Sequence, residues 1–88
     1  MSSDPTLERL RAELAKQDRA ILDVVNVRLR LVAELKRYKD ETGMPFVDAE
    51  QERRLLDRLA EANTGPLSEE GVRELFTTLL ALTKRELR

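Results

Sequence analysis

Two long cationic side chains, Arg28 and Lys39, interrupt the apolar face of what reads as one long helix. They are eleven residues apart in the sequence, and eleven steps of about 100° return a helix to within roughly 20° of its starting direction. Both side chains therefore point the same way, about 16 Å apart along the axis at a rise of about 1.5 Å per residue. Cations that reach into such a gap from both ends can clamp a small dianion.

A third cation, Arg11, lies seventeen residues before Arg28. This spacing turns it about 100° away from the direction of Arg28 and Lys39, so it cannot easily serve the same pocket from the same helix. In a dimer with antiparallel long helices, Arg11 would reach the pocket of the partner, and one site would draw on both chains. For any one of these cations alone, the alternative interpretation is a solvated side chain lying beside the core.

The residues that the chain lacks limit its chemistry. There is no His and no Cys, which removes the usual general base, a thiolate nucleophile and the common zinc ligands. An enzyme of this composition works by binding, orientation and fixed charges, and we expect no cofactor and no metal. Sixteen basic residues nearly balance seventeen acidic ones, so we also expect no binding to nucleic acid or to an anionic membrane.

The composition predicts an all-α protein. Aromatic residues make up 3% of the 88 residues, and there are only three Gly and three Pro, as is typical of helical proteins. The length allows one small domain, residues 1–88. No apolar stretch approaches the roughly 18 residues that cross a membrane, and no basic leader precedes an apolar run. We therefore expect a cytoplasmic protein.

The first predicted helix, over residues 5–42, is very long. Asp4 is a predicted N-cap with Pro5 at the first helical position, and no Pro or Gly follows until Gly43. This helix would measure roughly 50 Å. Its apolar residues recur at helical spacing, at Leu7, Leu10, Leu14, Ile21, Val25, Leu29, Val32 and Leu35.

Two shorter helices complete the predicted fold. Asp48 and Gln51 have capping-box spacing and start a helix over residues 48–62, which stops before Asn63-Thr64-Gly65-Pro66. Ser68 caps a third helix over residues 68–87. Because these two helices cannot cover the whole stripe of the first, a second copy of the chain is expected to cover the rest, in an intertwined helical homodimer with two-fold symmetry. The alternative is a long hairpin docked on a different protein.

The order of residues resembles the all-helical chorismate mutases of the AroQ class. The resemblance covers nearly the whole chain and is carried by Leu10-Arg11, Asp18, Arg28, Tyr38-Lys39, Pro45-Phe46-Val47-Asp48, Glu52-Arg53 and Asn63-Thr64-Gly65-Pro66-Leu67-Ser68. It implies a domain-swapped dimer of three-helix chains. It also implies a cofactor-free rearrangement of chorismate to prephenate, a reaction of the shikimate pathway in aromatic amino acid biosynthesis. A [3,3] rearrangement needs no proton transfer and no nucleophile, which suits a chain without His and Cys.

The resemblance also implies roles for single residues. Arg11 is similar to the arginine that crosses to the partner's site, Arg28 to the one that holds a substrate carboxylate, and Lys39 to the cation at the ether oxygen. A preorganised ammonium there would stabilise the transition state by about 3 kcal/mol. Asp48 and Glu52 match groups near the ring hydroxyl. The predicted catalytic residues are Lys39, Arg28 and Glu52, and the predicted substrate-binding residues are Arg11, Arg28, Lys39, Asp48, Gln51, Glu52, Thr83, Glu86 and Leu87.

Near the C-terminus and at helix two, the chain departs from the family pattern. Thr83 matches the small hydroxyl on the last helix, but Leu87 stands where the family usually has Gln or Glu to contact the ether oxygen. Glu86 faces nearly the same way from Thr83 and is the predicted substitute, or the contact is absent. Gln51 stands where many members have arginine, and a capping-box role competes with a substrate role for it. Asp48 has the corresponding alternative as a plain N-cap.

Rival functions follow from these departures. Asp48 and Glu52 beside the C4 substituent would also suit an ammonium group, so 4-amino-4-deoxychorismate is an alternative substrate. Others of the same fold remove pyruvate from isochorismate. A non-catalytic helical module that dimerises or docks is the alternative of another class, and a partner enzyme of aromatic biosynthesis is a possible companion in either case. The module interpretation predicts that Lys39 is dispensable.

Overall fold

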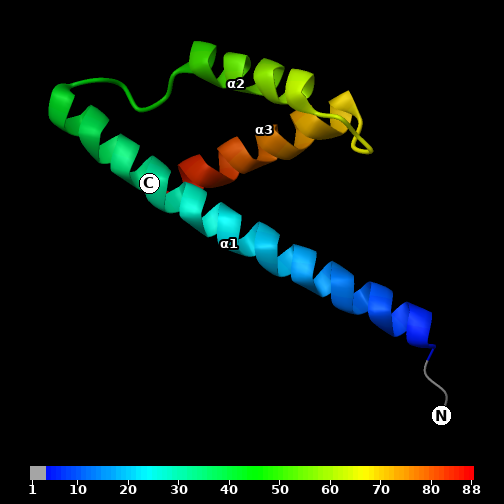
Figure 1. The fold of residues 1–88 in the computed structure, drawn as a ribbon. Helices are drawn as coiled ribbons and strands as arrows, with labels where there is room; N and C mark the ends of the chain where they lie inside the picture. Colours follow the sequence, from blue (N-terminus) through cyan, green and yellow to red (C-terminus); the bar gives the residue numbers. More distant parts are fainter. Residues whose placement is uncertain (1–3) are drawn as a thin grey trace. The chain divides into compact units, whose positions relative to one another are not determined.

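The computed structural model describes residues 4–88 and contains three helices, with no strand among these residues. They are α1 (Pro5–Thr42), α2 (Ala49–Ala62) and α3 (Glu69–Glu86) (Figure 1). The predicted all-α class with three helices is confirmed. The chain divides into two compact units, of which the first extends to Leu31 and the second comprises Val32–Arg88. The single domain and the homodimer stay predictions.

The start and end of α1 follow from local rules. The Asp4 Oδ1 atom accepts hydrogen bonds from the backbone N–H groups of Thr6 and Leu7, at 2.9 and 3.2 Å, as an N-cap does. At the other end, Gly43 has a φ of 73°, a left-handed conformation that favours glycine. The Met44 N–H then donates to the Lys39 carbonyl at 2.8 Å, which closes the helix with a Schellman motif.

The described part of the first unit is a single helical stretch of α1, and most of its large apolar side chains are exposed. None of the residues of α1 is buried in the single chain, and Leu14 is 62% exposed. The larger exposed apolar residues of this unit are Leu7, Leu10, Leu14, Ile21, Leu22, Val24, Val27 and Leu31. Exposed apolar side chains in this number on one helix are typical of a surface that another element covers.

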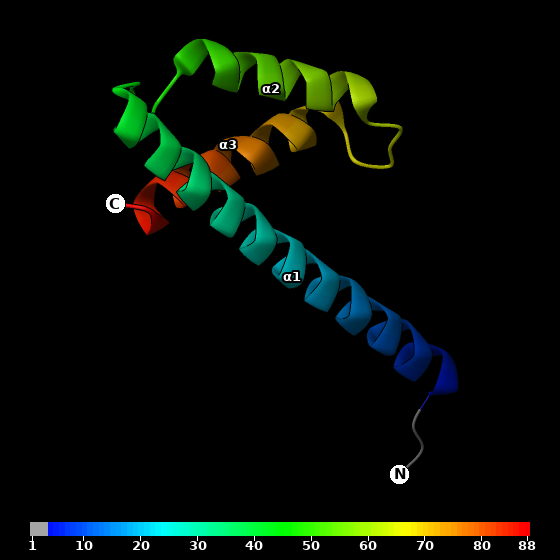
Figure 2. The ribbon, with the colours of Figure 1, turned by 60° about the vertical axis from the view of Figure 1, so that its left-hand side comes forward.

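The second unit is held together by packing between α2 and α3 (Figures 1 and 2). Val72 and Thr83 of α3 are its buried residues, 3% and 4% exposed. The turn between the two helices is fixed by Asn63, whose Nδ2 donates to the Leu67 carbonyl at 2.6 Å. Ser68 then caps α3, because its Oγ accepts from the Gly71 N–H at 3.0 Å. Within the described residues, no helix is long and apolar enough to cross a membrane.

Candidate active site

Lys39 lies in the last turns of α1, inside the second unit. Its Nζ donates to the Phe46 carbonyl at 3.2 Å, and its side chain is partly buried. The neighbouring Lys36 places its Nζ 5.7 Å from the centre of the Phe46 ring, a cation–π distance. Both lysines therefore hold the connection between α1 and α2. One N–H of the Lys39 ammonium is used by this contact, and an ammonium has three.

Asp48 and Gln51 stand at the start of α2. The Asp48 side chain accepts from the Gln51 N–H at 3.1 Å, with Asp48 in extended conformation as the N-cap. The N-cap interpretation of Asp48 is therefore confirmed. This bond is also the first half of the predicted capping box. A carboxylate has a second oxygen and further lone pairs, so the cap does not use up the acceptor capacity of Asp48.

Glu52, one turn further along α2, forms an ion pair with α3. The Lys84 Nζ lies 3.1 Å from Glu52 Oε2 and 2.5 Å from Oε1. The side chain of Glu52 is 23% exposed and that of Lys84 is 42% exposed. The packing of α2 on α3 thus fixes the position of the Glu52 carboxylate.

The C-terminal turns of α3 carry the other predicted site residues of this unit. The buried Thr83 donates its hydroxyl to the Leu79 carbonyl at 2.7 Å. Glu86 is the last residue of α3 and pairs with Arg85, at 3.6 Å. Leu87 is the C-cap, and its N–H donates to the Thr83 carbonyl at 3.1 Å. The helix therefore extends as far as Glu86, which is the condition under which Glu86 was predicted to replace the missing Gln or Glu.

The structure thus groups the predicted residues of the second unit in two places. Lys39 lies by the connection that leads to Asp48 and Gln51, and Glu52 lies beside the end of α3. Arg11 and Arg28 belong to the first unit, where Arg11 is exposed and Arg28 is partly buried.

An open groove of about 590 Å³ runs between α2 and α3. Its lining residues are Ala49, Glu52, Arg53, Leu56, Thr77, Leu80, Ala81, Lys84, Arg85 and Arg88. Among them, Glu52 was predicted from the sequence and Lys84 was not. Its signal was present, because Phe76, Leu80 and Lys84 follow each other at four-residue spacing along one face of α3. The same criterion that selected Arg28 and Lys39, a cation on an apolar face, selects Lys84.

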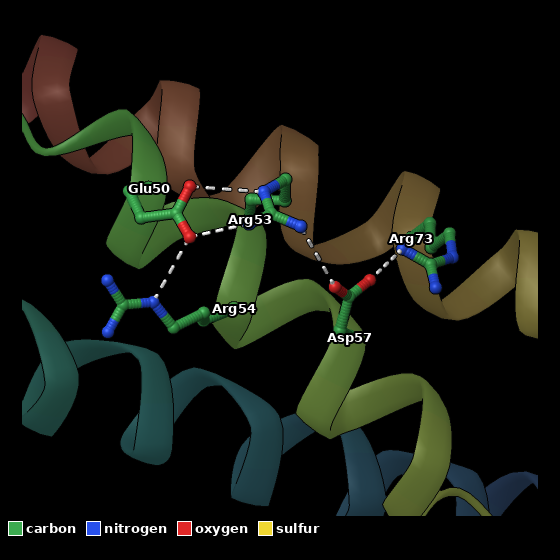
Figure 3. A network of polar contacts seen from close by, with 5 residues as sticks. All are labelled: Glu50, Arg53, Arg54, Asp57 and Arg73. Carbon is green, nitrogen blue, oxygen red and sulfur yellow. Dashed lines mark hydrogen bonds and ion pairs between the residues drawn. The ribbon is translucent and has the colours of Figure 1, made fainter.

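Three further cations of this helix pair, Arg53, Arg54 and Arg73, have carboxylate partners other than Glu52. Arg53 contacts Glu50 and, at 3.8 Å, Asp57, and Asp57 in turn accepts from Arg73 of α3 at 3.0 Å (Figure 3). Arg54 reaches the same Glu50 at 3.4 Å. This network joins α2 to α3 at a second point. No group of described residues has the His, Cys, Asp and Glu content to hold a metal ion.

Comparisons with known proteins identify the family. The family model described as chorismate mutase type II matches residues 10–87. Two solved structures of chorismate mutase from Thermus thermophilus are similar to the chain. Form I is 33% identical, with 89% of this chain and 98% of that chain covered and a TM-score of 0.87. Form II is 32% identical, with 91% of each chain covered and a TM-score of 0.88. No curated protein matches the chain.

The matched span extends over every residue that the sequence analysis placed in the site, from Arg11 to Leu87. The chain therefore belongs to the type II chorismate mutase family, and the enzyme class and the function predicted from the sequence are confirmed with it.

Proposed function

We propose that the chain converts chorismate to prephenate without a cofactor, in a site that is completed by a second copy of the chain. The observation that carries this proposal is the family match over residues 10–87, which includes all of the proposed site residues. The similarity to a chorismate mutase over 98% of that chain supports it. The reaction is an intramolecular rearrangement in which the ether C–O bond breaks and a C–C bond forms, with no atom gained or lost.

In this proposal, the enzyme acts by holding the substrate and by fixed charges. Arg28 and the partner's Arg11 bind the two carboxylates of the flexible dianion and keep it in a compact chair. Holding the reacting ends together removes several kcal/mol of the barrier. Lys39 stands at the ether oxygen, which gains negative charge as its bond stretches, so its ammonium binds the transition state more tightly than the ground state.

The fixed position of the Lys39 ammonium supports this role. Its bond to the Phe46 carbonyl places the charge before substrate arrives, as electrostatic preorganisation requires. Glu52, held by Lys84, is proposed as the acceptor for the ring hydroxyl, and the N-cap Asp48, four residues earlier, is proposed as a second group near that hydroxyl. Thr83, Gln51 and Glu86 are proposed substrate contacts, and Leu87 is proposed to contribute an apolar contact where Gln or Glu is usual.

The proposed homodimer accounts for the apolar surface of the first unit. Helical side chains such as Leu14 and Ile21, both 62% exposed in the single chain, would be buried against a second copy. Arg11 stands on the same exposed stretch, as a residue donated to a partner would. Light scattering on the purified protein tests this arrangement, which predicts twice the chain mass of 10.1 kDa. A folded monomer would leave the pocket without Arg11 and would contradict the proposal.

The reaction itself is tested by mixing purified protein with chorismate and following the loss of its diene absorbance. Saturable turnover, with prephenate identified as the product after acid treatment, is expected. If chorismate is unchanged while 4-amino-4-deoxychorismate or isochorismate is consumed, the substrate proposal is wrong. If none of the three reacts, the non-catalytic module is the better account. A companion enzyme of aromatic biosynthesis and the cytoplasmic location stay predictions.

A further inference from the structure

The ion pair between Glu52 and Lys84 brings a positive charge next to the carboxylate that is proposed to face the ring substituent of the substrate. Both oxygens of Glu52 lie within 3.1 Å of the Lys84 Nζ. The two residues are 32 positions apart in the sequence and come from different helices. The pair therefore forms only because α2 and α3 pack against each other.

Two other cations of the groove, Arg53 and Arg85, are paired with carboxylates other than Glu52. Arg53 is directed at Glu50 and Asp57 (Figure 3), and Arg85 lies 3.6 Å from Glu86. Lys84 is thus the cation that the structure directs at Glu52. With 23% of its side chain exposed, the Glu52 carboxylate is also partly shielded from water, so its interaction with a neighbouring charge is less screened than at an open surface.

The pair changes what the carboxylate can accept. An ionised carboxylate has about four lone-pair sites, so Glu52 can hold Lys84 and still accept a hydrogen bond from a hydroxyl group. A neutral hydroxyl group at this position is not repelled by the Lys84 ammonium. An ammonium group at the same position would gain the carboxylate but would lie a few Å from the Lys84 ammonium, and like charges at such a distance repel.

We propose that Lys84 is a specificity-determining residue, which makes the site prefer a substrate with a hydroxyl group over one with an ammonium group at the ring carbon that Glu52 faces. This inference rests on the proposed function and on the proposed role of Glu52 in it. The two substrates that it separates are chorismate and its 4-amino-4-deoxy analogue, which differ in that one substituent.

The experiment compares kcat/KM for the two substrates in the wild type and in Lys84→Met, which keeps much of the side chain but removes its charge. The ratio of the amino substrate to chorismate is expected to rise by roughly tenfold, mainly through a lower KM for the amino substrate. Lys84→Arg, which keeps the charge, is expected to keep the wild-type ratio.

The control is Arg73→Met. Arg73 forms the other ion pair from α3 to α2, with Asp57 at 3.0 Å, and its side chain is 41% exposed against 42% for Lys84. Arg73→Met removes a comparable ion pair between α2 and α3 that does not involve Glu52. The ratio of kcat/KM for the amino substrate to that for chorismate is therefore expected to stay as in the wild type. A tenfold rise in this control as well would mean that loosening the helix pair sets the ratio, and would overturn the inference.

The outcomes separate this inference from the proposed function. If the wild type converts chorismate and Lys84→Met leaves the ratio unchanged, Lys84 does not set specificity while the proposed function stands. If the folded wild type converts neither substrate, the proposed function has failed, and the inference fails with it. Circular dichroism shows whether Lys84→Met is folded; if it is not, Lys84→Gln replaces it, with the same tenfold rise expected and an unchanged ratio contradicting the inference.

Discussion

Replacing Lys39 by alanine is expected to remove most of the activity while leaving the helices intact. The ammonium is preorganised by its 3.2 Å bond to the Phe46 carbonyl and is partly buried. Loss of one preorganised donor at a developing negative charge typically costs about 3 kcal/mol, so kcat should fall roughly 150-fold. The lost bond from this charged donor to a carbonyl should lower the free energy of unfolding by only about 1.5 kcal/mol.

Lys36→Ala is the matched control for this variant. Lys36 lies one turn earlier in α1, with its Nζ 5.7 Å from the Phe46 ring centre and 3.5 Å from Asp40 Oδ2. Losing the cation–π contact costs about 0.5–1 kcal/mol, and losing an exposed pair four residues apart costs about 0.3–0.5 kcal/mol. Its effect on stability should therefore resemble that of Lys39→Ala, with kcat within about twofold of the wild type.

The assay measures the initial rate of chorismate loss over a range of concentrations, and thermal unfolding by circular dichroism measures stability. The expected pattern is two variants of similar stability, of which only Lys39→Ala has lost kcat. Full kcat in Lys39→Ala would refute the proposed electrostatic mechanism. An equal loss in both variants would assign the effect to the shape of the connection around Phe46.

Three further substitutions test the local structure that positions the site. Ser68→Ala should lower the free energy of unfolding by about 1 kcal/mol, because the Gly71 N–H loses its cap, as measured by urea denaturation. Gly43→Ala should lower it by about 1–2 kcal/mol because of the φ of 73°; an unchanged unfolding midpoint would contradict the Schellman closure of α1. Thr83→Val removes the bond from its hydroxyl to the Leu79 carbonyl, which should change stability by about 1 kcal/mol, and it should raise KM for chorismate because the hydroxyl is a proposed substrate contact.

The helices could be predicted from the sequence because their ends are set by short-range rules. Asp4 and Ser68 cap the N–H groups two or three residues ahead of them, and Gly43 adopts the conformation that ends α1. Each of these interactions lies within one or two turns of chain, so residue type and spacing are enough to indicate it. The resemblance to a known family supplied the rest of the prediction, including the function.

The ion pair between Glu52 and Lys84 could not be predicted from these short-range rules. It joins residues 32 positions apart, and it depends on how α2 packs on α3, which propensity and periodicity do not specify. Periodicity could have marked Lys84 as a cation on an apolar face, but it could not have named its partner. The role of Arg11 is harder still to predict from local patterns, because Arg11 is proposed to act in the site of a second chain.

The most direct test of a chorismate mutase site shared between two chains is to mix two inactive variants. Arg11→Ala and Lys39→Ala are purified separately, unfolded and refolded together, and assayed with chorismate. In a mixed dimer, one of the two sites combines an intact Lys39 with an intact Arg11 from the partner, so random pairing is expected to restore about a quarter of the wild-type activity. A mixture no more active than the two variants measured separately would contradict the shared site.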